Sequence, residues 1–200
     1  MEEVKRAYGV MARQYIELFG SSDQVHADDL ALIGRHLSIR PGTVLDLGCG
    51  PGHLTAHLRS LDVEATGIDL VPEFIHHARA VHTHGRYQLG SMEQLPVRDA
   101  SVAGILAWYS LIHVPPSDLD GVFAELRRAI SPGGTLVAGF FAGDEVAPFE
   151  HKVATAYYWP IDELSARLRR AGFREIERER RPGTDAPGRR PHAALAAIAV

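Results

Sequence analysis

The stretch VLDLGCGPGHLT, residues 44–55, decides the fold, because it reads as a short apolar strand that runs into a glycine-rich loop and then a helix. Strand and helix patterns alternate along the chain after it. Segments of these lengths predict right-handed crossovers and a parallel, doubly wound sheet. Such a sheet binds its ligand beyond the carboxyl ends of its strands, so the glycine loop is the expected binding site.

Seven stretches have the composition of strands, and the last two follow each other without a helix between them. We therefore expect these two to pair as a hairpin, which places one antiparallel strand in an otherwise parallel sheet. The expected strands are 43–47, 64–69, 86–90, 101–108, 133–141, 174–181 and 192–200.

Apolar residues at helical spacing predict two helices before the glycine loop and several between and after the strands. Ser22 or Asp23 is the expected N-cap of the second helix, and Ser117 is expected to open the helix that follows the fourth strand. The stretch between the fifth strand and the last helix reads as irregular. The expected helices are 2–19, 21–37, 72–82, 117–130 and 160–173, with one more directly after the glycine loop.

The glycines of the loop are spaced G-x-G-x-G, and the spacing decides between kinds of nucleotide. Gly48, Gly50 and Gly52 let the backbone approach a ligand closely. A nicotinamide-binding loop reads G-x-G-x-x-G with a small third residue, where this chain has the bulky His53, and the Lys of a phosphate-binding P-loop is absent. Asp46 precedes the loop, where a carboxylate suits a cationic ligand better than a pyrophosphate.

A second acidic residue ends the next predicted strand. Asp69 lies at the spacing of about 20 residues expected for a carboxylate that accepts hydrogen bonds from ribose hydroxyls. Together with Asp46 and the three glycines, it indicates a cationic ligand that carries adenosine and no phosphate. S-adenosylmethionine fits that description.

On these residues the chain resembles the class I S-adenosylmethionine-dependent methyltransferases, in particular the small bacterial ones with two N-terminal helices. The resemblance implies a single-domain, Rossmann-like α/β fold with a doubly wound, mostly parallel seven-stranded sheet, a C-terminal antiparallel hairpin strand and two N-terminal helices. It implies an N-terminal helical cap at 1–40, a cofactor-binding core at 41–141, an acceptor-side lid at 142–160, and a C-terminal helix and hairpin at 161–200. It rests on YGVMARQY, VLDLGCGPGHLT, ATGIDL, LGSMEQLPVRDASVAGILAWYSLIHVPP, ELRRAISPGGTLVAGFF and DELSARLRRAGF, and so covers nearly the whole chain.

The resemblance also implies contacts to the cofactor. Gly48, Cys49 and Gly50 would lie against the methionine part and the ribose, Asp69 would bind the ribose hydroxyls, and Leu70 would lie beside the adenine. Cys49 reads as a small loop residue, since no base lies near it in sequence.

Further cofactor contacts follow the third and fourth strands. The family commonly has an acidic residue near the adenine amino group, and here Ser91 stands in its place, with Met92 next to it in the expected adenine pocket. Ala107 and Trp108, at the end of the fourth strand, would lie near the methionine carboxylate and the sulfonium.

Two tyrosines of the first helix resemble the aromatic residues that close over the cofactor in this group. Tyr8 and Tyr15 share one face of the predicted helix. The same spacing is equally compatible with simple core packing, with the hydroxyls at the edge of the core.

The segment AWYSLIHVPP follows the fourth strand, where this fold presents residues to the methyl acceptor. It lacks the N-P-P-Y motif of enzymes that methylate nucleic-acid bases. His113 is the first candidate for a general base, because imidazole titrates near neutrality, and Tyr109 is the second catalytic candidate. A His at this place can instead hydrogen-bond only loop backbone.

The polar and aromatic segment that precedes the last helix is interpreted as a lid or as a wall of the acceptor site. Its candidate residues are His151, Tyr157, Tyr158 and Trp159. These aromatic residues could enclose a small organic acceptor or simply hold the loop against the sheet.

Composition narrows the class of protein further. The net charge of −4 over 200 residues argues against a nucleic-acid partner, and the arginines near the end alternate with Glu177 and Glu179, as on a solvated strand. The single cysteine excludes an internal disulfide and suits a reducing cytoplasm. The start MEEVKRAYG has no apolar core, and no apolar run approaches the roughly 18 residues of a membrane span. We expect a cytoplasmic monomer or homodimer without membrane contact.

The chain has 11 histidines, but they do not predict a metal site. His53 and His57 are four residues apart on one helix, and four more histidines cluster between residues 76 and 84. No carboxylate or cysteine completes a metal-ligand pattern, and the HExxH motif is absent.

These residues predict an enzyme that transfers a methyl group from S-adenosylmethionine to an oxygen or nitrogen of a small metabolite. Alignment of the acceptor would do most of the work, with general-base help from His113 where the acceptor must lose a proton. Two alternatives stay open: a protein that binds the cofactor without transferring its methyl group, and an NAD-dependent oxidoreductase on a similar sheet.

Overall fold

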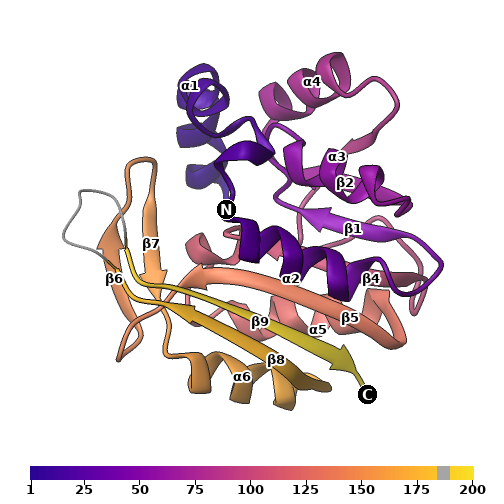
Figure 1. Ribbon diagram of the computed structural model, residues 1–200. Helices are drawn as coiled ribbons and strands as arrows, with labels where there is room; N and C mark the ends of the chain where they lie inside the picture. Colours follow the sequence, from indigo (N-terminus) through magenta and orange to yellow (C-terminus); the bar gives the residue numbers. More distant parts are fainter. Residues whose placement is uncertain (184–189) are drawn as a thin grey trace.

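The structure of the protein, a computed structural model, describes residues 1–183 and 190–200 (Figure 1). Within them the main sheet has seven strands in the spatial order β3-β2-β1-β4-β5-β9-β8, and β6 and β7 form a separate hairpin. The strands are β1 Val44–Leu47, β2 Ala65–Asp69, β3 Arg86–Leu89, β4 Val102–Trp108, β5 Ile130–Phe141, β6 Ala147–Glu150, β7 Thr155–Tyr158, β8 Phe173–Arg181 and β9 His192–Ala199.

Helices connect most of the strands and precede the first one. Pro72 stands at the start of α4, where its fixed φ suits the first helical turn. The helices are α1 Glu2–Phe19, α2 Ala27–Leu37, α3 His53–Ser60, α4 Pro72–Val81, α5 Leu119–Ala129 and α6 Ile161–Arg170, with short 3-10 turns η1 Ser22–Gln24 and η2 Leu111–His113.

The strand order reverses at β1, which pairs in parallel with β2 on one side and with β4 on the other. β9 runs antiparallel to both β5 and β8, so it is the antiparallel strand of the sheet. This topology confirms the predicted doubly wound, mostly parallel seven-stranded sheet with its C-terminal hairpin. It also places the binding site, by the general rule for such sheets, beyond the carboxyl ends of β1 and β4.

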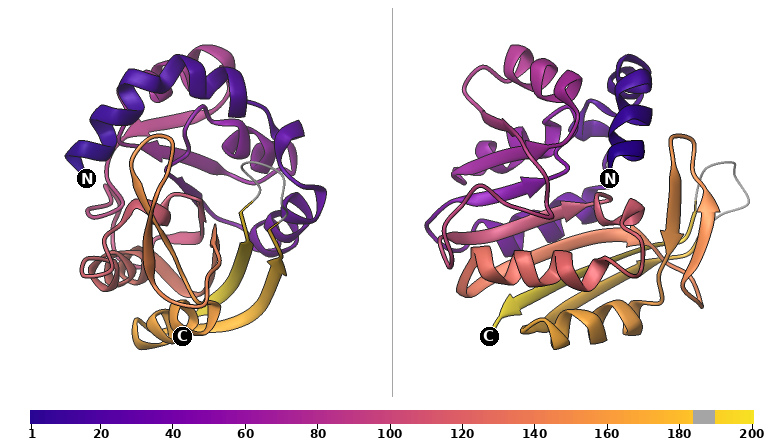
Figure 2. Two further views of the ribbon diagram at one scale, coloured as in Figure 1. Left: turned by 90° about the vertical axis from the view of Figure 1, so that its left-hand side faces the viewer. Right: turned by 180° about the vertical axis from the view of Figure 1, so that it is seen from behind.

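Helices lie on both faces of the sheet (Figure 2), and an apolar cluster packs between the sheet and the helices on each face. Successive residues of a strand point to opposite faces, so Leu45 and Leu47 pack toward α5 and α6, whereas Val44 packs toward α2 and α3. α4 lies on the same face as α3, where its Ala78 contacts Tyr87 of β3. The sheet is therefore buried on both faces, as expected of parallel strands.

The start of α2 differs from the prediction. The helix begins at Ala27 with His26 at the N-cap, whose Nδ1 accepts a hydrogen bond from the Asp28 N–H. Ser22 and Asp23, the predicted N-caps, lie instead in the separate turn η1, which Ser21 caps. The predicted cap was wrong because the polar run satisfies its own backbone in a 3-10 turn before the helix begins.

The boundaries around β5 also differ. α5 begins at Leu119 with Asp118 at the N-cap, while the hydroxyl of Ser117 bonds to the Asp118 carboxylate. β5 already begins at Ile130, which pairs with Val102 before the register shifts, so the Pro-Gly-Gly stretch lies inside an irregular strand.

The segment predicted to be irregular between β5 and α6 contains the antiparallel hairpin β6–β7. Figure 2 shows this hairpin standing beyond the sheet, on the side where α1 also lies. Its return strand carries Thr155, whose carbonyl contacts η2. The hairpin thus borders the expected binding site rather than only connecting two elements.

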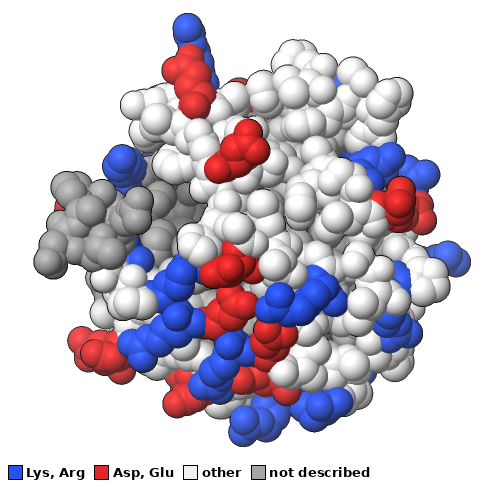
Figure 3. All heavy atoms as spheres, viewed as in Figure 1, with Lys and Arg blue, Asp and Glu red and all other residues white. Residues whose placement is uncertain are grey.

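Charged residues of both signs alternate over β8 and α2 on the face seen in Figure 3. Arg35 of α2 bonds to Glu177 and Glu179 of β8, and Arg178 bonds to Glu175 and Asp162. These local ion pairs lie at the surface, in keeping with the solvated strand face that the sequence predicted; Arg189 lies outside the described residues. No described helix combines the length and the apolar composition that crossing a membrane requires.

Candidate functional site

The glycine loop joins β1 to α3 and has a glycine at positive φ at every second position: Gly48 at 67°, Gly50 at 52° and Gly52 at 90°. A Cβ on Gly48 would overlap the Cβ of Ser110, which follows β4. A Cβ on Gly52 would lie 2.8 Å from the ring of Tyr87. The first and third glycines therefore allow close packing of the loop, whereas the space beside Gly50 is open apart from the Tyr15 ring at 3.8 Å.

Asp69 ends β2 beside this loop, and its carboxylate is 8% exposed. Its two oxygens accept hydrogen bonds from the N–H groups of Gly50 and Val71, each at 2.8 Å. Burial raises the pKa of Asp69, while these backbone hydrogen bonds act in the opposite direction. Among the described residues no Lys, Arg or His forms an ion pair with it. A buried carboxylate with free lone pairs fits a ligand that supplies hydroxyl donors and positive charge.

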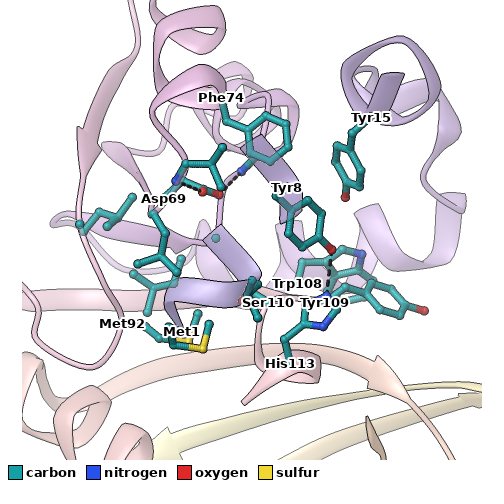
Figure 4. Close-up of a pocket in the computed structure, with 18 residues that line it drawn as sticks. Met1, Tyr8, Tyr15, Asp69, Phe74, Met92, Trp108, Tyr109, Ser110 and His113 are labelled. Carbon is teal, nitrogen blue, oxygen red and sulfur yellow. Dashed lines mark hydrogen bonds between the residues drawn. The ribbon is translucent and has the colours of Figure 1, made fainter. Parts of the chain in front are cut away.

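Asp69 faces a cavity at the reversal of strand order, which we call the Asp69 cavity (Figure 4). The wall is aromatic on the side of α1, where Tyr8, Tyr15 and Phe74 contact one another edge-on or tilted. The sequence-predicted residues that line this cavity are Tyr8, Tyr15, Gly48, Gly50, Asp69, Leu70, Met92, Trp108, Tyr109 and His113.

Five predicted cofactor residues do not line the Asp69 cavity. Gly52 caps α3, Ala107 is fully buried within β4, and the Ser91 hydroxyl donates to the Glu93 carboxylate at 3.1 Å. The side chains of Asp46 and Cys49 point to the face that α3 and α4 cover, and both residues line the second cavity described below. A direct cofactor contact by any of these five stays a prediction.

Asp46 is almost fully buried, and its carboxylate accepts a hydrogen bond of 2.6 Å from the hydroxyl of Thr55 on α3. Burial, with a smaller contribution from Asp69, raises the pKa of Asp46 to about 7, against the lowering by Thr55. The sequence anticipated an acidic group near a cationic ligand. In the structure the hydrogen bond to Thr55 ties β1 to α3, and Asp46 also lines the second cavity, so its place near a cationic ligand stays a prediction.

His113 is held at both ring nitrogens. Its Nδ1 lies 2.7 Å from the carbonyl oxygen of Thr155, which can only accept, so Nδ1 carries the proton. Nε2 is then free to accept the hydrogen bond from the Tyr8 hydroxyl at 2.9 Å. Burial lowers the pKa of His113. The neutral ring joins α1, η2 and β7, and a role as general base requires the Tyr8 hydroxyl to leave Nε2.

A second cavity of about 530 Å³ adjoins the first, and we call it the Phe141 cavity. The two cavities meet at the glycine loop and the end of β4, and the residues that line both are Tyr8, Tyr15, Gly48, Gly50, Trp108 and Tyr109. Its volume lies in the range of small-molecule sites, and its walls combine aromatic rings with a few polar groups.

Of the four residues predicted for the lid, His151 alone lines the Phe141 cavity in the part of the chain that the structure describes. Trp159 is a core residue at 2% exposure, and Tyr157 packs against the same core. Tyr158 stacks on Phe149, with ring centroids 4.3 Å apart, and so stiffens the hairpin.

Several lining residues were not predicted. Phe74 follows Asp69 by five residues and lies in the first turns of α4, a position that points back to the loop and could have been inferred. Met1 and Val4 reach the Asp69 cavity only through the placement of α1 against α4, which no local pattern indicates. Asp29 and Arg181 line the Phe141 cavity and meet His192, which lies beside Tyr109; these residues belong to three distant segments. No described group of three or more His, Cys, Asp or Glu side chains could hold a metal ion.

Residues 44–134 match the family described as a methyltransferase domain. The chain is 34% identical to the malonyl-[acyl-carrier protein] O-methyltransferase of Erwinia billingiae over 166 residues, which are 80% of this chain and 60% of that protein. It is 31% identical to the O-methyltransferase cnsE of Penicillium expansum, over 72% of this chain and 57% of that protein. The chain thus spans about 60% of the length of these relatives.

Solved structures share the whole fold. The Burkholderia thailandensis 1,6-didemethyltoxoflavin-N1-methyltransferase, determined with 1,6-didemethyltoxoflavin and S-adenosylhomocysteine, aligns with a TM-score of 0.82 at 21% identity, over 100% of this chain and 88% of that one. The [4+2]-cyclase SpnF aligns with a TM-score of 0.79 at 18% identity, over 98% of this chain and 97% of that one. The sheet order and the glycine loop agree with these matches: residues 44–134 form a methyltransferase domain, and the chain has the fold of the class I S-adenosylmethionine-dependent methyltransferases.

Proposed function

We propose that the protein transfers the methyl group of S-adenosylmethionine to an oxygen or nitrogen of a small molecule. The observation that carries this proposal is the Asp69 carboxylate, which is buried without a cationic partner among the described residues and faces a cavity that opens into a second one. One cavity for the methyl donor and an adjoining one for the acceptor is the arrangement that direct transfer needs.

S-adenosylmethionine supplies a methyl group that its sulfonium already activates. In this chain Asp69 would accept the ribose hydroxyls, and Leu70 and Met92 would flank the adenine. Gly48 and Gly50 would let the backbone lie against the ribose and the methionine part, because neither has a side chain on that side.

The remaining task of the protein is to align the acceptor and exclude water. Trp108 and Tyr109 line both cavities and would stand on either side of the path between donor and acceptor. Tyr8 and Tyr15 cover this junction from α1, and the Tyr8–His113 hydrogen bond holds that helix against the loop after β4. These residues would therefore close the site around the bound pair.

The relatives support oxygen as the methylated atom, since the Erwinia and Penicillium proteins are both named O-methyltransferases. The Burkholderia protein, which is named an N1-methyltransferase, keeps nitrogen as the second possibility. The mixed charges on the face in Figure 3 and the net charge of −4 support a small-molecule acceptor over a nucleic acid.

A label-transfer assay tests the reaction. The protein is incubated with methyl-labelled S-adenosylmethionine and, in parallel, with small phenols, carboxylic acids, amines and a malonyl thioester. Transfer of label to one acceptor class, lost in the Asp69→Asn variant, is the expected result. Binding of S-adenosylhomocysteine with no label transfer to any class would favour the alternative of a cofactor-binding protein; the fold itself allows this, because one protein that shares it is named a cyclase.

A further inference from the structure

Four side chains from distant segments form a connected polar chain that ends at the junction of the two cavities. Tyr109 follows β4, His192 begins β9, Asp29 lies in α2, and Arg181 ends β8. The Tyr109 hydroxyl is hydrogen-bonded to Nδ1 of His192. His192 Nε2 lies 3.4 Å from an Asp29 oxygen, and both Asp29 oxygens accept hydrogen bonds of 2.6 Å from Arg181.

The positions of the protons follow from the chemistry of each group. Asp29 can only accept while it is ionised. Burial raises its pKa, whereas the nearby His192 and Arg181 side chains lower it. His192 therefore carries its proton on Nε2, toward Asp29, and its Nδ1 accepts from the Tyr109 hydroxyl. In this order the imidazole of His192 can act as a base toward the Tyr109 hydroxyl, and the carboxylate of Asp29 orients the imidazole.

These polar side chains are buried, unlike those of a surface ion pair. Asp29 and His192 are 4% and 5% exposed. Tyr109 adopts a φ of 54°, which is uncommon for a residue with a Cβ and directs the ring between Trp108 and Phe141. A strained aromatic residue held by two buried polar groups is typical of a functional position.

We propose that Asp29 and His192 form a proton relay behind Tyr109, and that through Tyr109 it takes the proton of a phenolic or enolic hydroxyl held in the Phe141 cavity. The proposal rests on the proposed methyl transfer and names its acceptor class. The aromatic walls of the cavity, including Trp108 and Phe141, suit a planar ring. Tyr109 would be the catalytic residue, and His192 and Asp29 the positioning residues.

Every proton that moves in this step passes between the acceptor, Tyr109 and His192. The acceptor hydroxyl gives its proton to the Tyr109 oxygen as Tyr109 gives its own proton to Nδ1 of His192. Tyr109 stays neutral throughout, which agrees with the raising of its pKa by burial. The acceptor oxygen takes the methyl group, the donor leaves as the neutral thioether, and the proton remains on the imidazolium of His192 beside Asp29.

Two charged side chains lie near His192. An Asp29 oxygen from α2 lies 3.4 Å from Nε2, and Arg181 of β8, which pairs with His192 of β9, bonds both Asp29 oxygens. Trp108 and Tyr109 present uncharged rings to the imidazole, with centroids 5.6 and 5.5 Å away. The Asp29 carboxylate therefore lies beside the ring nitrogen opposite the one that faces Tyr109.

The test uses 4-nitrophenol, whose visible spectrum distinguishes the phenol from the phenolate. The protein is first saturated with S-adenosylhomocysteine. 4-Nitrophenol is then bound, and its visible spectrum is recorded as the pH is varied. We expect the bound compound to ionise at a pH at least about one unit below that of the free compound, because the relay takes up its proton. His192→Asn, which can still accept from Tyr109 but cannot take up a proton, should remove this shift, and so should Tyr109→Phe.

Arg35→Gln is the matched control, since Arg35 also joins α2 to β8 but lies at the surface, away from Tyr109. It should leave the shift unchanged. Failure of 4-nitrophenol to bind, binding as the neutral phenol, or an equal shift in wild type and His192→Asn would each overturn the relay. Calorimetry with S-adenosylhomocysteine on the wild type and every variant separates the two proposals. If the wild type does not bind S-adenosylhomocysteine, the proposed function is contradicted. If it binds but the ionisation pH of bound 4-nitrophenol is not shifted, only the relay is contradicted.

Discussion

The Tyr8 hydroxyl lies 2.9 Å from Nε2 of His113, and this hydrogen bond fastens the N-terminal helix to the loop that follows β4. The two rings also meet edge-on, with centroids 5.5 Å apart. Because Nδ1 of His113 donates to the hairpin at Thr155, one imidazole joins three elements around the cavity. The sequence proposed separate roles for these two residues, a cofactor cover and a base, and the structure makes them partners.

Tyr8→Phe tests this partnership. The substitution keeps the ring contacts and removes the hydrogen bond that stabilises neutral His113, so the pKa of His113 should rise. One hydrogen bond contributes about 0.5–1.5 kcal/mol, which corresponds to a rise of up to about one pKa unit. Nuclear magnetic resonance titration of the His113 ring protons measures the change.

Tyr15→Phe provides the control for that titration, because the Tyr15 hydroxyl makes no hydrogen bond to the described residues while its ring packs beside that of Tyr8. Its effect on His113 should be negligible. An unchanged or lowered His113 pKa in Tyr8→Phe would mean that Nε2 does not accept from Tyr8.

Asp69→Asn should weaken binding of S-adenosylhomocysteine. The amide has one oxygen, so it can accept from only one of the Gly50 and Val71 N–H groups with that atom. The substitution also removes the negative charge to which the ligand hydroxyls would donate. Hydrogen bonds to charged groups contribute about 1.5–3 kcal/mol, so the Kd should rise roughly 10- to 150-fold. Calorimetry measures it, with the fully exposed Asp144→Asn as the control; equal affinities in both variants would remove Asp69 from the binding site.

Gly48→Ala and Gly50→Ala should differ in their cost to stability. Both residues have positive φ, where an alanine costs about 1–2 kcal/mol. The new Cβ at position 50 has room, whereas the one at position 48 overlaps Ser110, which adds about 1–3 kcal/mol of overpacking. Denaturant unfolding compares the two variants.

Ser110→Gly in the Gly48→Ala background removes the overlapping Cβ and should recover the overpacking part of the loss. Ser110→Ala should not, because it keeps that atom. Equal free energies of unfolding for Gly48→Ala and Gly50→Ala would show that the loop and the β4 terminus do not pack as described.

Asp46 should make stability depend on pH. Its pKa is raised to about 7 in the folded protein and lies near 4 in an unfolded chain, so the folded state binds the proton more tightly between these values. Its contribution to stability is therefore fully present below about pH 4 and is lost as the pH rises to about 7.

Asp46→Asn has no titrating group there, so its stability relative to wild type should increase over that range. Thermal unfolding at several pH values measures the difference in stability between the two proteins. The contributions of the other titrating groups cancel in this difference. A constant difference from pH 4 to 7 would contradict a raised pKa for Asp46.

The elements around the glycine loop could be predicted from sequence because their signals are local. The apolar run of β1, the glycines and Asp69 at the end of β2 each depend on neighbouring residues, and they lie where the pattern placed them. The start of α2 was wrong because Ser22 and Asp23 can satisfy backbone groups in a 3-10 turn as well as at a helix cap.

The parts of the site that the sequence could not predict depend on contacts between distant segments. Asp29 and Arg181 are separated by 152 residues, and only the pairing of β8 with β9 brings them to His192. The hairpin β6–β7 likewise has a weak strand pattern, and its position is fixed by the His113–Thr155 hydrogen bond. Asp46 was placed in the correct strand, but its side chain points away from the Asp69 cavity because strand residues alternate between faces.

Binding of S-adenosylmethionine in the Asp69 cavity is best tested by calorimetric titration with S-adenosylhomocysteine, with NAD in a parallel experiment. We expect S-adenosylhomocysteine to bind to one site per chain with a Kd in the micromolar range, about −8 kcal/mol, and NAD to give no heat. Binding of NAD alone, or no heat with either compound in folded protein, would contradict it.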